Sequence, residues 1–417
     1  MIVKPLIELS KKISSGLTPL RSNPEFWDNG TIPWLKTEQL GEKYIYETNE
    51  HISEVALEKT AIRLFPVNSL SIAMYGEGKT RGNLSILKKS MATNQACCNV
   101  EIDSDKADYE YVYYFLKTQY DELRQLSSGV RKNLNSNDIK NYPIRLPSSL
   151  DEQRKIACVL KVLDDKIALN NRINAELEAM AKTLYDYWFV QFDFPDANGK
   201  PYKTSGGKME YNATLKREIP AEWKSGTLDD LGQIVGGSTP KTSKPENFTT
   251  NGTPWITPND LSDNQSNKFI SRGAQDVSVE GIKSASLKTY PAGTVLLSSR
   301  APIGYMAIAR NELTTNQGFK SFIPSKNYST EYVYYAVKNS LPVIVQNASG
   351  STFKEVSGSV LKSIDVMLPA FSVADHFTKT VAEIFSRQDK LEQENQQLTA
   401  LRDWLLPLLM NGQVTVK

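Results

Sequence analysis

The sequence Glu-Tyr-Val-Tyr-Tyr at residues 110–114 occurs a second time, unchanged, at residues 331–335. Shorter matches flank it at the same offset of 221 or 222 residues: Pro-Trp at 33–34 and 254–255, Thr-Asn-Gln at 93–95 and 315–317, Leu-Pro at 146–147 and 368–369. An offset this long lies far outside the roughly 20–50 residues of solenoid repeats. The chain therefore consists of one domain with its connector, used twice. Such a molecule suits a target with two comparable halves, of which double-stranded DNA is the commonest.

The bulk composition predicts a soluble cytoplasmic protein with no membrane partner. At 417 residues, with 40% hydrophobic and 23% charged, the chain has room for two or three ordinary globular domains. The first residues lack the apolar core of a secretory signal, and the apolar tract 404–410 is too short to span a bilayer. Three cysteines fit a reducing compartment, and we expect Cys97 and Cys98 to be small residues of a buried strand. A net charge of +2 is low for a nucleic-acid binder, so any DNA contact would use local patches.

The two copies differ in hydrophobic period along their length. Each begins with a segment of mixed character, in which short apolar runs such as 67–74 and 294–298 predict buried strands and Glu-Tyr-Val-Tyr-Tyr opens a helix. After each Leu-Pro pair, apolar residues recur at alternating spacings of 4 and 3, the pattern of a coiled coil. Pro407 should stop or kink the second of these helices near its end.

This pattern predicts a mixed α/β fold with internal pseudo-two-fold symmetry, in which two similar α/β domains are separated by two long antiparallel coiled-coil helices. The expected divisions are a first domain at 1–148, a first helix at 149–191, a loop-like linker at 192–214, a second domain at 215–370 and a second helix at 371–417.

Asparagines interrupt the apolar seam of the predicted helices. Asn170 and Asn174 lie in the first seam and Asn395 in the second, where Asn174 and Asn395 are equivalent positions, 221 residues apart. A buried asparagine lowers stability but fixes register when it finds a polar partner. We therefore expect these three residues to set the register of a helix pair. Two unrelated amphipathic helices, each lying on its own domain, are the alternative.

The junction between the copies carries the most specific motif. Tyr-Trp-Phe-Val-Gln-Phe-Asp-Phe-Pro at 187–195 is followed by Ser-Gly-Gly at 205–207, Ile-Pro at 219–220 and Trp223. With the Pro-Trp and Thr-Asn-Gln pairs and Glu-Gln at 152–153, this chain resembles, over essentially its whole length, the specificity subunit of type I restriction–modification enzymes. One departure is the start of the second helix, where residues 372–376 lack the Glu-Gln pair.

The resemblance implies a function without catalysis. It implies two target recognition domains that each read one half of a split sequence in double-stranded DNA, and helices that set the distance between them. It also implies two methylation subunits as partners, with restriction subunits added in the full complex.

The residues themselves offer no catalytic site, cofactor site or metal site. Gly-Lys-Thr at 78–80 lacks the earlier glycine of a phosphate-binding loop, because that position is Ala73. His51 and His376 are isolated and do not form a ligand set. An enzyme with an unrecognised site and a coiled-coil scaffold that does not bind DNA are the two alternatives.

The duplication also helps to find base-reading residues. Residues identical in both copies cannot distinguish two different half-sites, so we expect Thr-Asn-Gln, Pro-Trp and the repeated tyrosines to be buried scaffold. Readers should be polar and should differ between the copies, and they should use side chains that hydrogen-bond bases and phosphates. Glycine-containing loops supply such candidates: Lys79, Thr80, Arg81, Asn83, Arg131, Lys132 and Asn133 in the first copy, and Arg300, Thr352 and Lys354 in the second. An ordinary solvated loop is the alternative for each.

Overall fold

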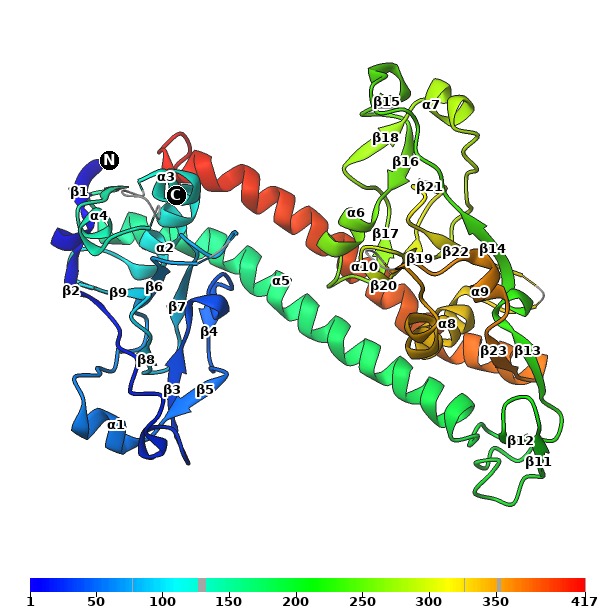
Figure 1. The fold of residues 1–417 in the computed structure, drawn as a ribbon. Coiled ribbons are helices and arrows are strands. Elements are labelled where there is room, and N and C mark those ends of the chain that lie inside the picture. The colour runs from blue at the N-terminus through cyan, green and yellow to red at the C-terminus, as the bar shows by residue number, and fades with distance from the viewer. Residues whose placement is uncertain (77, 127–132, 326, 351–353, 417) are drawn as a thin grey trace. The chain divides into compact units, whose positions relative to one another are not determined.

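The computed structural model describes all 417 residues except 77, 127–132, 326, 351–353 and 417. The chain divides into two compact units, of which unit 1 comprises Met1–Ile167 and Gln397–Lys417 and unit 2 comprises Ala168–Gln396. Two long helices, α5 (Leu150–Tyr185) and α10 (Phe371–Met410), contribute to both units. Each unit therefore holds one α/β domain, the start of the helix that follows it and the end of the other long helix (Figure 1). In the part of the chain that the structure describes, no helix is long and apolar enough to cross a membrane.

The domain of unit 1 is built on a five-stranded sheet of order β2-β9-β6-β7-β4. Its strands are β2 (Ser10–Ser15), β9 (Cys97–Ile102), β6 (Leu70–Ala73), β7 (Leu84–Leu87) and β4 (Tyr44–Ile45). Every residue of β6 and β7 is buried, because α2 (Tyr109–Thr118) packs on one face and residues around Leu35 and Met91 pack on the other. The remaining elements are β1 (Ile2–Pro5), β3 (Ile32–Leu35), β5 (Glu50–Ile52), α1 (Glu54–Lys59), β8 (Ala92–Thr93), α3 (Tyr120–Gln125), α4 (Ser136–Lys140) and β10 (Pro143–Leu146), with short 3₁₀ turns at Leu6–Leu9, Pro24–Phe26 and Thr37–Gln39.

Unit 2 repeats this topology. Its five-stranded sheet has the order β14-β22-β19-β20-β17, in which each strand takes the place of its counterpart in unit 1. These strands are β14 (Gly232–Gly236), β22 (Lys320–Pro324), β19 (Val295–Ser299), β20 (Ile303–Ala309) and β17 (Phe269–Ile270). The other elements are β13 (Lys224–Thr227), β15 (Phe248–Thr249), β16 (Thr253–Ile256), α6 (Pro258–Asp263), β18 (Gln275–Val277), α7 (Val279–Ser284), β21 (Thr314–Thr315), α8 (Thr330–Gln346), α9 (Gly358–Lys362) and β23 (Asp365–Leu368), with 3₁₀ turns at Leu228–Asp230 and Pro245–Asn247. The duplication seen in the sequence is thus a duplication of one mixed α/β fold, as predicted.

The repeated tyrosines are core residues, as expected. Asp108 and Ser329 cap α2 and α8 by accepting a backbone N–H three residues later. Tyr111 and Tyr332 are almost fully buried, and their hydroxyl groups donate to backbone carbonyls of β10 and β23 at 3.1 and 3.2 Å. Each motif therefore fastens its helix to the strand that leads into α5 or α10.

The long helices pair in antiparallel orientation, as an amide network in unit 2 shows. The amide of Asn170 donates to the side-chain oxygen of Asn395 at 2.9 Å, and the amide of Asn395 donates to that of Asn171 at 2.7 Å. One helical turn further along α5, the backbone carbonyl of Asn174 accepts from Gln388 at 3.3 Å. The contact partner on α10 thus moves toward lower residue numbers as the residue number on α5 increases, which defines an antiparallel pair. Asn174 and Asn395, equivalent in sequence, therefore have different partners.

The ends of the helices differ from the sequence-based expectations. Helix α10 includes Pro407 in its last turn and ends at Met410, close to the predicted position and before the expected residue 417, and a proline there removes only one backbone hydrogen bond. Helix α5 ends in a π-helical turn, η4 (Asp186–Val190). The linker after it is not purely a loop, since β11 (Met209–Asn212) pairs with β12 (Arg217–Pro220).

Candidate nucleic-acid interface

The first candidate loop joins β6 to β7 in unit 1. Arg124 and Tyr120 hold it from α3: the guanidinium donates to the carbonyl of Gly78 at 2.8 Å, and the tyrosine hydroxyl donates to the carbonyl of Lys79. Gly78 has a φ of +56°, a conformation that favours glycine. Lys79 is left with an exposed side chain at the tip of a braced loop.

The other candidates of unit 1 are less accessible than Lys79. Thr80, Arg81 and Asn83 are half-buried, and the amide of Asn83 donates to the carbonyl of Leu40 at 3.1 Å, so it helps to hold the loop. Asn133 is also half-buried. Arg131 and Lys132 lie outside the described residues.

The candidates of unit 2 lie at the matching edge of its sheet. Arg300 follows β19 and forms a backbone bridge with Glu355, and its guanidinium lies 3.7 Å from that carboxylate. Lys320 lies 3.7 Å from the other oxygen of the same carboxylate. Lys354, next to Glu355, is exposed, whereas Thr352 lies outside the described residues. The structure therefore brings Arg300 and Lys354 together, and their contact with DNA stays a prediction.

Sequence reasoning missed an exposed polar pair in each unit. Thr18 donates its hydroxyl to the side-chain oxygen of Gln95, and Thr239 donates to Gln317 in the same way. Both glutamines are exposed. The expectation that all of Thr-Asn-Gln is buried scaffold is thus wrong for the glutamine, although Thr93 and its counterpart are fully buried. The turn after the short strand directs the glutamine outward, and periodicity over three residues could not reveal this.

One lysine in each unit, half-buried in unit 1 and buried in unit 2, joins the α/β domain to the helix pair, and this role also has no signal in the sequence. In unit 1 the ammonium of Lys43 lies 3.0 Å from Glu110 and 3.4 Å from Asp164 of α5. Asp164 also accepts hydrogen bonds from Tyr114 and, at 3.0 Å, from Arg402 of α10. The last tyrosine of the repeated motif thus reaches the helices.

In unit 2 the equivalent lysine uses a different carboxylate. The ammonium of Lys268 lies 2.6 Å from Glu178 of α5 and donates to Gln388 of α10 at 2.7 Å, and its side chain is 4% exposed. Tyr335 and Lys338 also bond Glu178, at 3.0 and 2.7 Å. Burial lowers the pKa of Lys268 to about 8, although the charge of Glu178 opposes this shift. In both units, therefore, a lysine at the same position of the fold joins the domain to the helices, but its carboxylate partner on α5 comes from a different position in each.

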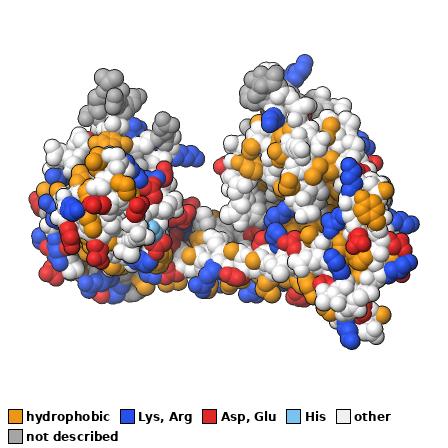
Figure 2. Space-filling model, turned by 60° about the horizontal axis from the view of Figure 1, so that its bottom comes forward, with side chains coloured by type: hydrophobic (Ala, Val, Ile, Leu, Met, Phe, Trp, Pro, Cys, Tyr) orange, Lys and Arg blue, Asp and Glu red, His pale blue; other side chains and the backbone are white. Residues whose placement is uncertain are grey.

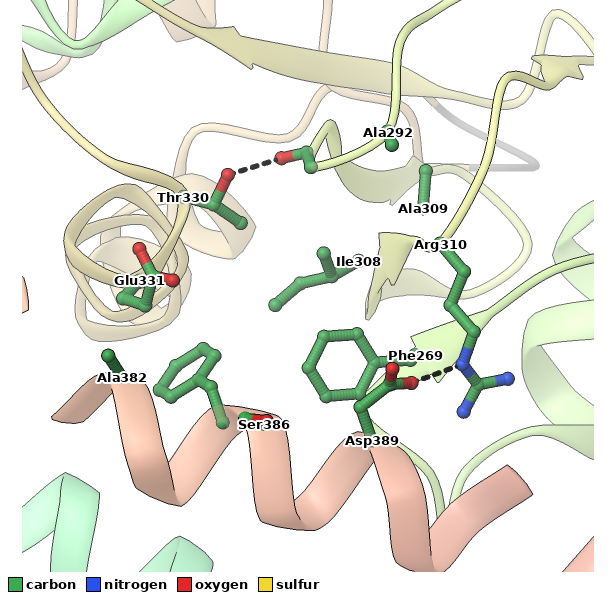
Figure 3. A pocket seen from close by; sticks show the side chains of 12 residues that line it. Phe269, Ala292, Ile308, Ala309, Arg310, Thr330, Glu331, Ala382, Ser386 and Asp389 are labelled. Atoms are coloured by element: carbon green, nitrogen blue, oxygen red, sulfur yellow. Dashed lines mark hydrogen bonds and ion pairs between the residues drawn. The ribbon is translucent and has the colours of Figure 1, made fainter. Parts of the chain in front are cut away.

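Unit 2 also contains a small pocket of about 330 Å³ between β20, α8 and α10 (Figure 3). Its apolar lining includes Phe269, Ile308 and Phe385. Arg310, which also lines it, is paired with Asp389. In unit 1 the position of Phe269 is taken by Tyr44, whose ring lies under the ammonium of Lys88 at 4.7 Å. Arg310 also pairs with Glu392 at 2.8 Å, so its charge is balanced by carboxylates of α10.

The described residues offer no cluster of metal ligands. Among them no group of three or more His, Cys, Asp or Glu could hold a metal ion. Cys97 and Cys98 are buried in β9, and burial raises the pKa of the Cys98 thiol to about 11, so it is not a reactive thiolate near neutral pH. On the face shown in Figure 2, basic and acidic side chains are intermixed over each unit. This surface suits contact through single loops better than through a broad basic field.

Gln153 explains the departure at the start of the second helix. Its side chain donates to the carbonyl of Pro147 at 2.9 Å and accepts the backbone N–H of Asp108 at 3.0 Å, and it is 1% exposed. The equivalent residue in the second repeat is Ala374, which is also buried. The glutamine of the Glu-Gln pair thus serves the contact between the α/β domain of unit 1 and α5.

The fold and its loops define a class of protein: a duplicated α/β module mounted on paired helices, with polar loops at one edge of each sheet. The model of the type I restriction modification DNA specificity domain matches residues 3–179 and again residues 220–401. The chain belongs to this family, and the resemblance found in its motifs is confirmed.

Two curated relatives agree with this assignment. The MjaIX specificity subunit of Methanocaldococcus jannaschii is 39% identical over 49% of this chain, a match that spans only 46% of the relative's own length. The HindI specificity subunit of Haemophilus influenzae is 28% identical over 70% of this chain and 73% of its own length. A solved type I S subunit from M. genitalium superposes over 98% of this chain and 95% of its own, with a TM-score of 0.61 and 17% identity. This last likeness shows the shared fold.

Proposed function

We propose that the chain is the DNA-recognition subunit of a type I restriction–modification complex. Residues 1–148 and 215–370 each read one half of a bipartite site in double-stranded DNA, and α5 and α10 set the length of the unread spacer. One observation carries this proposal. The two copies of the fold present polar side chains at corresponding ends of their sheets, in the loops that follow β6 and β19, and these side chains differ between the copies. Lys79 stands at that end in unit 1, and Arg300 with Lys354 in unit 2.

In this proposal the chain has no catalytic activity and needs no cofactor. Two methylation subunits act on the DNA that it selects, and restriction subunits join them for cleavage. The family description, a type I restriction modification DNA specificity domain, supports this division of labour.

The test is to compare the pure chain with the assembled complex. The chain alone, given S-adenosylmethionine or magnesium together with DNA, should neither methylate nor cleave, whereas the complex with methylation subunits should methylate one bipartite motif. Methyl transfer by the pure chain would contradict the proposal. If no assembly binds DNA in a salt-dependent manner, the chain is instead a coiled-coil scaffold.

A further inference from the structure

The exposed pair Thr18–Gln95 and its counterpart Thr239–Gln317 are the same in both units, down to the direction of the hydrogen bond. In each, a half-buried threonine hydroxyl donates to the amide oxygen of an exposed glutamine. Because that oxygen accepts from the threonine, the amide NH₂ group of the glutamine is directed elsewhere. Each pair thus offers two neutral N–H donors at the surface.

In both repeats a glycine and a buried tryptophan hold the loops that carry the threonine and the glutamine together. A Cβ atom on Gly16 would lie 2.1 Å from the carbonyl oxygen of Thr93, and one on Gly237 would lie 2.1 Å from that of Thr315. Only glycine lets the two loops approach this closely. The indole N–H of the buried tryptophan of each Pro-Trp motif donates at 3.1 Å to the carbonyl of the residue just before the threonine. The residues shared by the two copies therefore serve to present the glutamine.

Backbone hydrogen bonds place the pair beside the candidate reading loops. In unit 1 Met74 donates its N–H to the carbonyl of Ala96, the residue after Gln95, at 2.8 Å. The carbonyl of Met74 accepts from Leu134, the residue after Asn133, at 3.1 Å. Met74 also begins the loop that carries Lys79. In unit 1 Gln95, the loop that carries Lys79 and the backbone at Asn133 therefore lie close together.

Unit 2 has the same chain of contacts. Ser299 donates to the carbonyl of Gly318, the residue after Gln317, at 2.8 Å. The carbonyl of Ser299 accepts from Val356 at 3.0 Å, next to the loop that carries Lys354, and Arg300 follows directly. In both repeats, therefore, the glutamine that the two copies share lies next to loops whose residues differ between the copies.

We propose that Gln95 and Gln317 bind the phosphate–sugar backbone of DNA at the two half-sites, irrespective of base sequence. This inference rests on the proposed function and adds the anchoring contact to it. Residues identical in both units cannot tell two half-sites apart, but the DNA backbone is the same in each. Glutamine amides are common phosphate ligands, and such contacts fix the position of a protein on the duplex without reading sequence. The differing residues next to them can then meet the base edges.

The test uses the full chain assembled with its methylation subunits and two duplexes, one with the methylated motif and one with that motif scrambled. Gln95→Ala and Gln317→Ala should each weaken binding to both duplexes by the same factor, about three- to tenfold, the loss of one hydrogen bond. The dependence on salt should keep its slope, because a neutral donor releases no counterion. The control is Gln233→Ala, an exposed glutamine at the far end of the strand that leads to Thr239, which should leave binding unchanged.

The outcomes separate the anchor from other roles. Unchanged affinity of both variants, in a parent complex that binds DNA, would overturn the inference and leave the proposed function intact. A loss confined to the motif duplex, or a changed motif, would show that the glutamines read bases and would overturn it as well. A parent complex that binds neither duplex would contradict the proposed function itself.

Discussion

Replacement of Glu178 by glutamine tests how unit 2 is held to its helices. The change keeps size and polarity but leaves the ammonium of Lys268, 4% exposed, without the carboxylate at 2.6 Å. Removal of one partner from a buried ion pair typically costs 3–5 kcal/mol. Glu178 is itself 27% exposed, and Tyr335 and Gln388 still bond Lys268, so we expect a loss at the lower end, about 3 kcal/mol.

The assay is hydrogen exchange of unit 2 under native conditions, read by mass spectrometry, because a chain of two units need not unfold in one step. Amides around β17 should lose protection by the expected free energy, and those of β6 should not change. The matched control in unit 1 is Arg402→Gln. Asp164 keeps the ammonium of Lys43 at 3.4 Å when the guanidinium is removed, so no buried charge is left without a partner and this change should cost about 1 kcal/mol or less. A second change, Lys268→Met, should recover most of the loss in Glu178→Gln. A loss below about 0.5 kcal/mol in Glu178→Gln would refute the reasoning, since surface changes reach that size.

Three further predictions concern pH, assembly and spacing. Burial alone would raise the pKa of Glu178, but Lys268 and Lys338 lower it below its ordinary value of 4.5. The stabilisation by this carboxylate is therefore complete above pH 4.5 and is lost as the pH falls through the lowered pKa. Glu178→Gln should remove this pH dependence from the free energy of unfolding. A half-chain of residues 1–200 should dimerise through its helix, as sedimentation would show, and with methylation subunits it should recognise a palindrome of the first half-site; a folded monomer would count against paired helices. Four residues inserted at Asn170-Asn171, about 6 Å of helix, should lengthen the unread spacer by one or two base pairs in the mapped motif, and an active variant with the old spacer would exclude the helices as the ruler.

The sequence predicted those features whose signal is periodic or repeated. The spacing of apolar residues predicted the two long helices, and the duplicated tyrosines predicted the buried faces of α2 and α8. The partners of the seam asparagines did not follow from their equivalence. In an antiparallel pair of duplicated helices, residues that are equivalent in sequence face each other only at the midpoint of the pair. Asn395 therefore bonds Asn170 and Asn171 instead of its sequence equivalent Asn174.

Features that depend on long-range contact could not be predicted. Lys43 and Lys268 have the appearance of surface lysines in the sequence, yet each contacts a helix residue more than a hundred positions away. The turn that carries Gln95 packs closely against Gly16, almost eighty residues earlier in the chain. Both features recur in the two copies of the fold, which distinguishes them from contacts that occur in one copy only.

The central claim, that each repeat reads its own half-site, is tested most directly by mapping methylated bases in DNA from cells that make the complex. The comparison is between the parent, a Lys79→Ala variant and an Arg300→Ala variant. We predict a bipartite motif with an unread spacer for the parent, a change only in one half for Lys79→Ala, and a change only in the other half for Arg300→Ala. A continuous motif, or changes that spread over both halves in either variant, would contradict the account.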